Sequence, residues 1–341
     1  MLPLRPAEQR ALEIARTIAG ERILSTTLGR AQAAHELAIE RPGARVACWF
    51  LDQHQQRLAT AERQLANLSL SCEPDLPEQE IDLAVLPFSM RGEAELTRDL
   101  LQSAIQRLKL GGKLVAATDN PRDDWLREQL GIWFKKVTKH AFDDGVVYVV
   151  TKQEPLKKVK NFRAEFVFRD GDNLITAVSR PGVFSHRHVD PGARHLLEAA
   201  EVRPGMRILD IGCGAGTVSL ALAKREPTAQ ILAVDSNARA VQCTQLGAEL
   251  NGLAHITTEL NASGEYVDPG SFDLALANPP YFADFEIALR FVQAAHNSLR
   301  VGGQLLLVTK APSWYEENLQ ADWREVEIVP SKRYFVVVAR K

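Results

Sequence analysis

One sequence pattern occurs twice along this chain of 341 residues, and the repeat restricts the fold more than any other feature. Residues 22–38 align with residues 207–223 without a gap, so that Ser25 pairs with Asp210. Later landmarks repeat with similar spacing: Asp52 with Asp235, 81–86 with 272–277, and Gly111 with Gly302. Each copy alternates predicted strands and helices, which predicts two tandem α/β domains.

In the second copy, a predicted strand at 207–211 runs directly into a glycine-rich turn and a helix at 217–224. Three glycines stand at alternate positions of the turn: Gly212, Gly214 and Gly216. Glycines allow a tight turn and a close approach of the backbone to a ligand, as in nucleotide-binding α/β units. Asp210, at the end of the strand, is placed to accept a hydrogen bond from a ligand amine, directly or through water.

The next predicted strand, 230–235, ends in an acidic residue, Asp235. A carboxylate at this point of an α/β unit is placed to accept from both hydroxyls of a ribose. The alternative is a helix N-cap, because another helical run begins at Ser236. The sequence alone leaves both interpretations open.

A rigid polar segment follows the predicted strand at 272–277, and it consists of Asn278, Pro279, Pro280 and Tyr281. The two prolines fix φ and remove two backbone donors, so the loop is stiff and its carbonyls are free to accept. A planar amine held there would meet the oxygen of the Asn278 side chain, a backbone carbonyl and the ring of Tyr281. The plainer interpretation is a rigid turn with an asparagine cap.

Taken in this order, the three features resemble the class I S-adenosylmethionine-dependent methyltransferases that act on exocyclic nitrogens. The resemblance implies that Asp210 and the three glycines form the cofactor loop and that Asp235 binds the ribose. It implies that Asn261 and Ala262 contact the adenine of the cofactor. It also implies that residues 278–281 are the catalytic motif.

The segment 180–185 (RPGVFS), together with the two-copy layout, resembles a more specific family, ribosomal RNA small subunit methyltransferase C, and its large-subunit relatives. The implied fold is a pair of Rossmann-like class I methyltransferase domains, the first degenerate, with Phe184 near the cofactor and the base pocket. The implied cofactor is S-adenosylmethionine, and the implied reaction is methylation of guanine N2 in ribosomal RNA of the small subunit. That family commonly has Asn-Pro-Pro-Phe-His, whereas Phe282 follows Tyr281 here. Adenine N6 of tRNA or rRNA, or the N5 of a protein glutamine, therefore remains open as the target.

The first copy lacks the residues that the chemistry needs. Ser25 stands in place of Asp210, and two of the three glycines are replaced, by Thr27 and Ala31. Pro87 aligns with Asn278, and Leu-Pro-Phe-Ser at 86–89 stands in place of the tetrad. We expect this copy to keep the fold, to bind no cofactor and to support the RNA.

The resulting domain prediction is a degenerate methyltransferase-like domain at 1–153, a basic linker with a β-hairpin at 154–180, and a catalytic domain at 181–341. The basic residues of the linker are Lys157, Lys158, Lys160 and Arg163, and phenylalanines lie among and after them. They could follow a phosphate backbone, or they could simply be a solvated linker.

Composition and residue spacing argue against several kinds of site and of protein. The net charge is -2, so a nucleic-acid surface must be a local patch, and the four scattered cysteines suggest neither a disulfide framework nor a zinc site. The histidines near residue 188 lack metal-ligand spacing, and we expect no metal. We find no signal peptide or membrane-spanning run, so we expect a cytoplasmic protein, which two pseudo-symmetric halves make plausible as a monomer. A non-enzymatic ribosome-assembly module is the rival outside enzymes.

Overall fold

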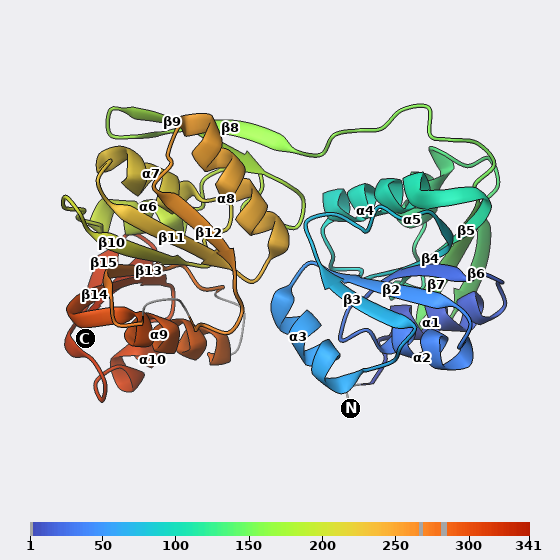
Figure 1. Cartoon of the computed structure of the whole chain (residues 1–341), viewed down its shortest axis with the longest axis horizontal. Coiled ribbons are helices and arrows are strands. Elements are labelled where there is room, and N and C mark those ends of the chain that lie inside the picture. Colours follow the sequence, from blue (N-terminus) through green and yellow to red (C-terminus); the bar gives the residue numbers. More distant parts are fainter. Residues whose placement is uncertain (1–2, 266–268, 281–284) are drawn as a thin grey trace. The chain divides into compact units, whose positions relative to one another are not determined.

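The computed structural model describes residues 3–265, 269–280 and 285–341, which form two compact units, Met1–Phe162 and Arg163–Lys341 (Figure 1). Each unit has one seven-stranded sheet, which confirms the predicted class of two tandem α/β domains. Among the described residues, no helix is long and apolar enough to cross a membrane.

The first unit has its strands in the order β3-β2-β1-β4-β5-β7-β6, with β7 antiparallel to both of its neighbours. Its elements are α1 (Pro6–Arg16), β1 (Arg22–Thr26), α2 (Gln32–Glu40), β2 (Arg45–Phe50), α3 (Gln53–Glu62), β3 (Leu68–Cys72), β4 (Ile81–Phe88), α4 (Ala94–Arg107), β5 (Leu108–Thr118), α5 (Trp125–Gly131), β6 (Thr138–Phe142) and β7 (Gly145–Thr151).

The second unit opens with a two-stranded hairpin and then repeats the same sheet order, β12-β11-β10-β13-β14-β16-β15. Its elements are β8 (Ala164–Asp170), β9 (Asn173–Ser179), α6 (Pro191–Ala199), β10 (Arg207–Ile211), α7 (Thr217–Arg225), β11 (Gln230–Asp235), α8 (Ala238–Asn251), β12 (Ile256–Leu260), β13 (Phe272–Ala277), α9 (Glu286–Ser298), β14 (Leu299–Thr309), α10 (Pro312–Asn318), β15 (Arg324–Ser331) and β16 (Tyr334–Arg340).

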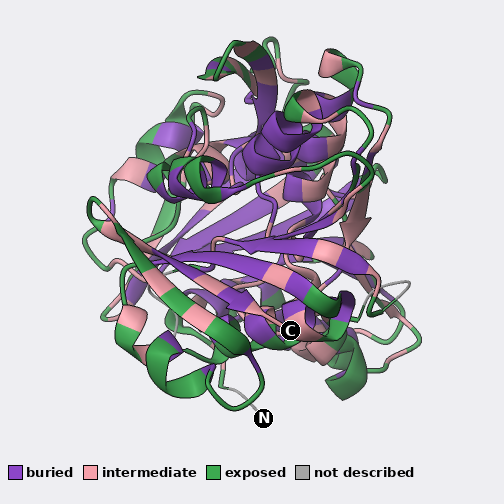
Figure 2. Ribbon diagram, turned by 90° about the vertical axis from the view of Figure 1, so that its left-hand side faces the viewer, coloured by how far each residue is buried: buried purple, intermediate pink, exposed green. Residues whose placement is uncertain are grey.

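The central strands are apolar because helices cover both faces of each sheet. In β10, Ile208 packs in one core with residues of α6, α7 and α8, whereas Leu209 and Ile211 pack in another with residues of α9 and α10. Figure 2 shows the same distribution, with buried residues along the strands and exposed residues on the outer faces of the helices.

The hairpin β8–β9 belongs to the second unit and is not a separate connecting segment, so its placement differs from the predicted division at 154–180. Phe168 and Ile175 lie in the core of that unit. Arg225 of α7 binds both carboxylate oxygens of Asp170 at 2.7 Å. The hairpin β8–β9 therefore packs against α7 and α8.

The strand register corrects one predicted alignment. Ile23 of β1 faces Val46 of β2, and Ile208 of β10 faces Ile231 of β11, so the gapless alignment of β1 with β10 continues through the second strand. This register gives the place of Asp235 to Phe50, and the alignment of Asp52 with Asp235 was therefore wrong by two positions. The Asp52 carboxylate caps α3 by accepting from the Gln55 N–H. The first unit thus has no acid at the end of β2.

Candidate active site at the carboxyl edge of the second sheet

Three polar residues lie where neighbouring parallel strands of the second sheet end. Asp210 lies near the end of β10, Asp235 ends β11, and Asn278 directly follows β13. The strand β10 lies between the other two, at the point where the strand order reverses. Ligands of open α/β sheets bind outside the carboxyl ends of the strands at such a point.

The glycine turn after β10 has a backbone that other residues rarely adopt. All three glycines have positive φ, between 58° and 74°. A Cβ added to Gly216 would lie 2.8 Å from the Thr244 side chain, whereas one added to Gly214 would meet no atom within 4 Å. Gly216 therefore allows the loop to pack on α8, and Gly214 borders open space at the edge of the sheet.

The Asp235 carboxylate is fixed beside this turn. Oδ2 accepts from the Gly214 N–H at 2.9 Å, and Oδ1 accepts from the Asn237 N–H at 2.9 Å. The N-cap of α8 is Asn237, whose side chain accepts from two backbone N–H groups, so the helix-cap interpretation of Asp235 does not hold. A carboxylate has about four acceptor positions, so it can accept several hydrogen bonds at once.

Asp210 is a buried carboxyl with a perturbed pKa. Its exposed fraction is 4%, and its Oδ2 accepts from the Ser219 hydroxyl at 2.5 Å. Burial raises the pKa of Asp210 to about 6, and the nearby carboxylate of Asp235 adds to the rise. A buried carboxylate of this kind is stabilised by a cationic ligand, because a positive charge offsets the loss of hydration.

The described part of the predicted catalytic tetrad, residues 278–280, directly follows β13. Asn278 is half-buried, Pro279 is buried and Pro280 is exposed, while Tyr281 lies outside the described residues. The Asn278 Nδ2 donates to Oδ2 of Asp190 at 2.9 Å. Asp190 was not predicted as a site residue, although an aspartate before Pro191 is a recognisable helix-start signal.

A small cavity of about 40 Å³ joins five of the predicted residues: Phe184, Asp210, Gly212, Gly214 and Asn278. Asp190 also lines it. The remaining described site residues are outside its lining: Gly216, Asp235, Asn261, Ala262, Pro279 and Pro280. Asp235 is nevertheless adjacent, because its carboxylate holds the N–H of Gly214.

Asn261 is placed after β12 as expected, but its side chain is used within its own loop. Its Nδ2 donates to Glu259 Oε1 and to the Glu265 carbonyl, and its Oδ1 accepts from the backbone of Ser263 and Gly264. A contribution of Asn261 to a ligand site is therefore expected to come from the shape of the loop, which includes Ala262.

Phe184 lies in a bent segment before α6. Its side chain is 57% exposed beside the cavity, and Ser185 and Arg187 both have positive φ although neither is glycine. The Ser179 hydroxyl holds this bend, because it accepts from the Arg187 N–H at 3.0 Å and lies 2.8 Å from His186 Nδ1. Strained backbone of this kind gathers at functional sites. No group of three or more potential metal ligands occurs among the described residues.

The fold and this site match known methyltransferases. A family model described as Methyltransferase small domain matches residues 174–339. The ribosomal RNA small subunit methyltransferase C of Shewanella loihica is 28% identical over 326 residues, which cover 89% of this chain and 90% of that protein. The protein of the same name from Pseudomonas entomophila is 33% identical over 181 residues, which cover 51% of this chain and 52% of that protein.

A solved structure matches both units. The 16S rRNA N2 G1207 methyltransferase of T. thermophilus, solved with AdoMet and guanosine, superposes with a TM-score of 0.83 and 24% identity over 99% of this chain and 92% of that chain. The chain is thus similar to ribosomal RNA small subunit methyltransferase C proteins along most of its length. The predicted resemblance to that family and the predicted methyltransferase class are confirmed, and a non-enzymatic module is not supported.

In the first unit, a carboxylate from α1 binds the loop that corresponds to the glycine turn. The Glu8 carboxylate, from α1, accepts from the Thr27 hydroxyl at 2.6 Å and from the Leu28 N–H at 3.1 Å. When the gapless alignment is extended to α1 and α6, the counterpart of Glu8 is Ala193, which lines the cavity of the second unit. A carboxylate of the first unit thus lies where the second unit has only the small side chain of Ala193 beside its cavity. In the second unit the N–H of Cys213, the counterpart of Leu28, donates instead to the Val234 carbonyl at 3.0 Å. That the first unit binds no cofactor remains a prediction.

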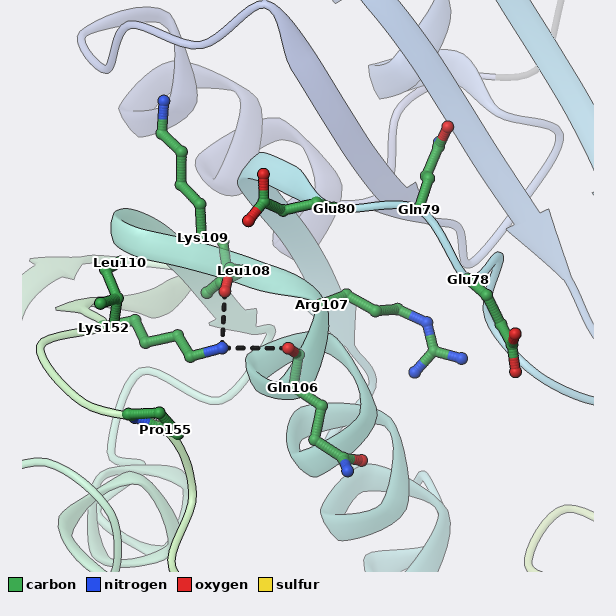
Figure 3. Close-up of a pocket in the computed structure, with 10 residues that line it drawn as sticks. All are labelled: Glu78, Gln79, Glu80, Gln106, Arg107, Leu108, Lys109, Leu110, Lys152 and Pro155. Carbon is green, nitrogen blue, oxygen red and sulfur yellow. Dashed lines mark hydrogen bonds between the residues drawn. The ribbon is translucent and has the colours of Figure 1, made fainter.

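Another hollow of the first unit, drawn in Figure 3, is structural. Lys152 donates to the carbonyls of Gln106 and Leu108 at 3.0 and 2.6 Å, where α4 meets β5. The other cations point away from Lys152, because Lys109 pairs with Asp82 at 2.7 Å and Arg107 donates to backbone carbonyls. Since these charges are used within the fold, the hollow offers no convergent group to a ligand.

Proposed function

We propose that the second unit transfers a methyl group from S-adenosylmethionine to the exocyclic N2 of a guanine in ribosomal RNA of the small subunit. One observation carries the proposal: the Asn278 amide is hydrogen-bonded to Asp190 at the carboxyl edge of the second sheet. It lines the same cavity as the glycine turn and the buried Asp210. The relatives support guanine N2 and 16S rRNA as the target, because the T. thermophilus protein is a 16S rRNA N2 methyltransferase.

The residues at this edge fit the cofactor. Gly214 leaves open space that a Cβ would fill, the Asp235 carboxylate is placed for the ribose hydroxyls, and Asp210 provides a buried negative charge for the amino group. We assign the remaining predicted contacts to Gly212, Gly216, Phe184 and the 261–262 loop. When bound, S-adenosylmethionine supplies an activated methyl group on a sulfonium.

The side of the site that meets the base is built by Asn278 and Pro279. The lone pair of an exocyclic amine is delocalised into its ring, which makes the amine a poor nucleophile. Acceptance of its two N–H bonds by Asn278 Oδ1 and the Pro279 carbonyl favours a pyramidal nitrogen and stabilises the positive charge that develops on it. Tyr281, outside the described residues, is proposed as a stacking partner for the base, which must first leave its stack. Pro280 keeps the segment stiff.

Asn278→Ala tests this assignment. We expect turnover to fall roughly 10²–10³-fold, in analogy with the loss of one oxyanion-hole donor, while cofactor affinity measured by calorimetry stays near that of the wild type. Asn318→Ala is the matched control, because Asn318 is an exposed asparagine of α10. Full turnover of Asn278→Ala would rule out the proposed role.

Nucleoside mass spectrometry of the methylated RNA tests the target. We expect N2-methylguanosine in small-subunit rRNA incubated with the protein and the cofactor. N6-methyladenosine would move the target to adenine, and methylation of a protein glutamine without any RNA product would contradict the RNA assignment.

For the first unit we propose a role in holding the RNA, and a basic cleft supports it. The cleft encloses about 1110 Å³ beside β5, β7 and the following linker, and five lysines line it with one acid, Glu154: Lys113, Lys135, Lys136, Lys157 and Lys158. Trp133 and Phe134 contribute half-buried rings. Lysines beside aromatic rings suit a single-stranded RNA backbone with its bases stacked. We further propose that the protein is a cytoplasmic monomer.

Charge reversal tests the cleft. Lys135→Glu with Lys136→Glu should weaken RNA binding and reduce the slope of log affinity against log salt by about 0.7 for each phosphate that the protein no longer neutralises. The matched control reverses Arg57 and Arg91, which are exposed in the same unit and outside the cleft. Equal losses of affinity in the two double variants would contradict a specific role for the cleft.

A further inference from the structure

The carboxylate of Asp190 joins the start of α6 to the segment after β13. Its Oδ2 accepts from the Ala193 N–H at 3.2 Å, which caps the helix, and from Nδ2 of Asn278 at 2.9 Å. Asp190 and Asn278 lie far apart in the chain, yet both line the cavity. One oxygen atom therefore serves a helix terminus and the amide proposed for catalysis.

We propose that Asp190 is the positioning residue that sets the orientation of the Asn278 amide, an inference that rests on the proposed function of Asn278. The two ends of a primary amide have nearly the same shape, so packing alone does not decide which end faces a ligand. An ionised carboxylate only accepts, and it therefore selects the NH₂ end of the amide. The acceptor Oδ1 is then on the other branch of the side chain, where it can meet an amine. A flipped amide would bring two acceptors together and break a charge-assisted hydrogen bond.

The first unit shows that the fold does not require an aspartate at this position. In the same gapless alignment, Arg5 stands in place of Asp190, and α1 begins there with a proline at its first turn, as α6 does. The place of Asn278 is taken by Pro87, whose ring carries no amide. The carboxylate and the amide are thus absent together from the unit in which we expect no chemistry.

The position of Asp190 also ties Asn278 to the bent segment that carries Phe184. Asp190 ends this segment, shortly after Phe184, and Phe184 lines the same cavity. A shift of Asp190 would therefore disturb both the acceptor and the exposed ring beside it. Displacements of about 1 Å at a reacting group can cost about 10²-fold in rate, so a small reorientation is expected to be measurable.

Two substitutions separate the helix cap from the contact with Asn278. Asp190→Ser keeps an oxygen that can cap α6, but its shorter side chain does not reach Asn278. Asp190→Asn keeps both the reach and one acceptor oxygen. We expect Asp190→Ser to lower kcat roughly tenfold with unchanged cofactor affinity and thermal midpoint, and Asp190→Asn to recover most of that loss.

A double-mutant cycle with Asn278→Ala gives the decisive comparison. If Asp190 acts through Asn278, the double variant with Asp190→Ser is no slower than Asn278→Ala alone. A second measurement is independent of activity: in protein labelled with ¹⁵N-asparagine, the Asn278 side-chain amide signals should shift in Asp190→Ser and stay near their wild-type positions in Asp190→Asn.

The outcomes distinguish this inference from the proposed function. Normal turnover of Asn278→Ala would overturn the role of Asn278 itself. A slow Asn278→Ala together with a normal Asp190→Ser, or with losses that multiply in the double variant, would overturn only the positioning role of Asp190. Unchanged amide signals in Asp190→Ser would likewise contradict it.

Discussion

The buried carboxyl of Asp210 should make both stability and cofactor binding depend on pH. Its pKa is raised from the ordinary 3.8 to about 6, because burial disfavours the charged form. The folded protein therefore binds this proton more tightly than the unfolded chain does. The contribution of the proton to stability is fully present below about pH 4 and is lost as the pH rises from 4 to 6.

The size of this effect follows from the shift. A difference of about two pKa units corresponds to about 3 kcal/mol between the protonated and ionised forms. Asp210→Asn keeps an oxygen for the Ser219 hydroxyl but has no proton to lose. Relative to the wild type, the variant should therefore gain up to about 3 kcal/mol of stability between pH 4 and pH 6, and little more above pH 6.

Hydrogen exchange provides the assay, because it reports on the second unit alone. Wild type and Asp210→Asn are compared at equal pH, so that intrinsic exchange rates cancel, and peptides covering 207–223 are followed. Calorimetry should show that the wild type loses S-adenosylmethionine affinity below about pH 6, up to tenfold per pH unit, while the variant binds weakly at every pH. A difference in protection that stays constant from pH 4 to pH 7 would refute the reasoning.

Four further substitutions probe the ligand edge of the second unit and the corresponding loop of the first. Gly214→Ala should cost about 1 kcal/mol of stability, because its φ is positive, and should abolish cofactor binding in calorimetry. Gly216→Ala should lower the thermal midpoint of the second unit more than Gly214→Ala does, because its Cβ also meets Thr244. Asp235→Ala should weaken cofactor affinity with little change in saturated turnover, and unchanged affinity would exclude the ribose role. Glu8→Ala should lower the stability of the first unit by about 1–3 kcal/mol without creating a cofactor site, and uptake of cofactor by a variant with the second site disabled would contradict that expectation.

The duplication could be detected from the sequence because corresponding strands of the two units are buried and therefore share the same apolar pattern. The apolar run of β4 is fully buried, as a central strand of a parallel sheet must be, and its counterpart β13 repeats the pattern. The positions of the strands and of the loops between them follow from such local patterns. The alignment of Asp52 with Asp235 failed because sequence matching followed the acidic residue, whereas the register follows the hydrogen bonds of the strands.

Sequence by itself determined the residues whose role depends on local backbone chemistry. The glycines at alternate positions and the two prolines after Asn278 set the backbone freedom of their loops wherever the strands lie. Together with the acid at the end of β11, their identity was enough to predict a ligand edge there.

Only the tertiary structure decided which side chains meet. Nothing in the spacing of Asp190 and Asn278, or of Glu8 and Thr27, indicates a contact, because each pair is brought together by the packing of a helix against the edge of a sheet. The buried state of Asp210 has the same origin. Its elevated pKa arises from the layers that cover β10, and no property of the residue or of its neighbours in the chain reveals it.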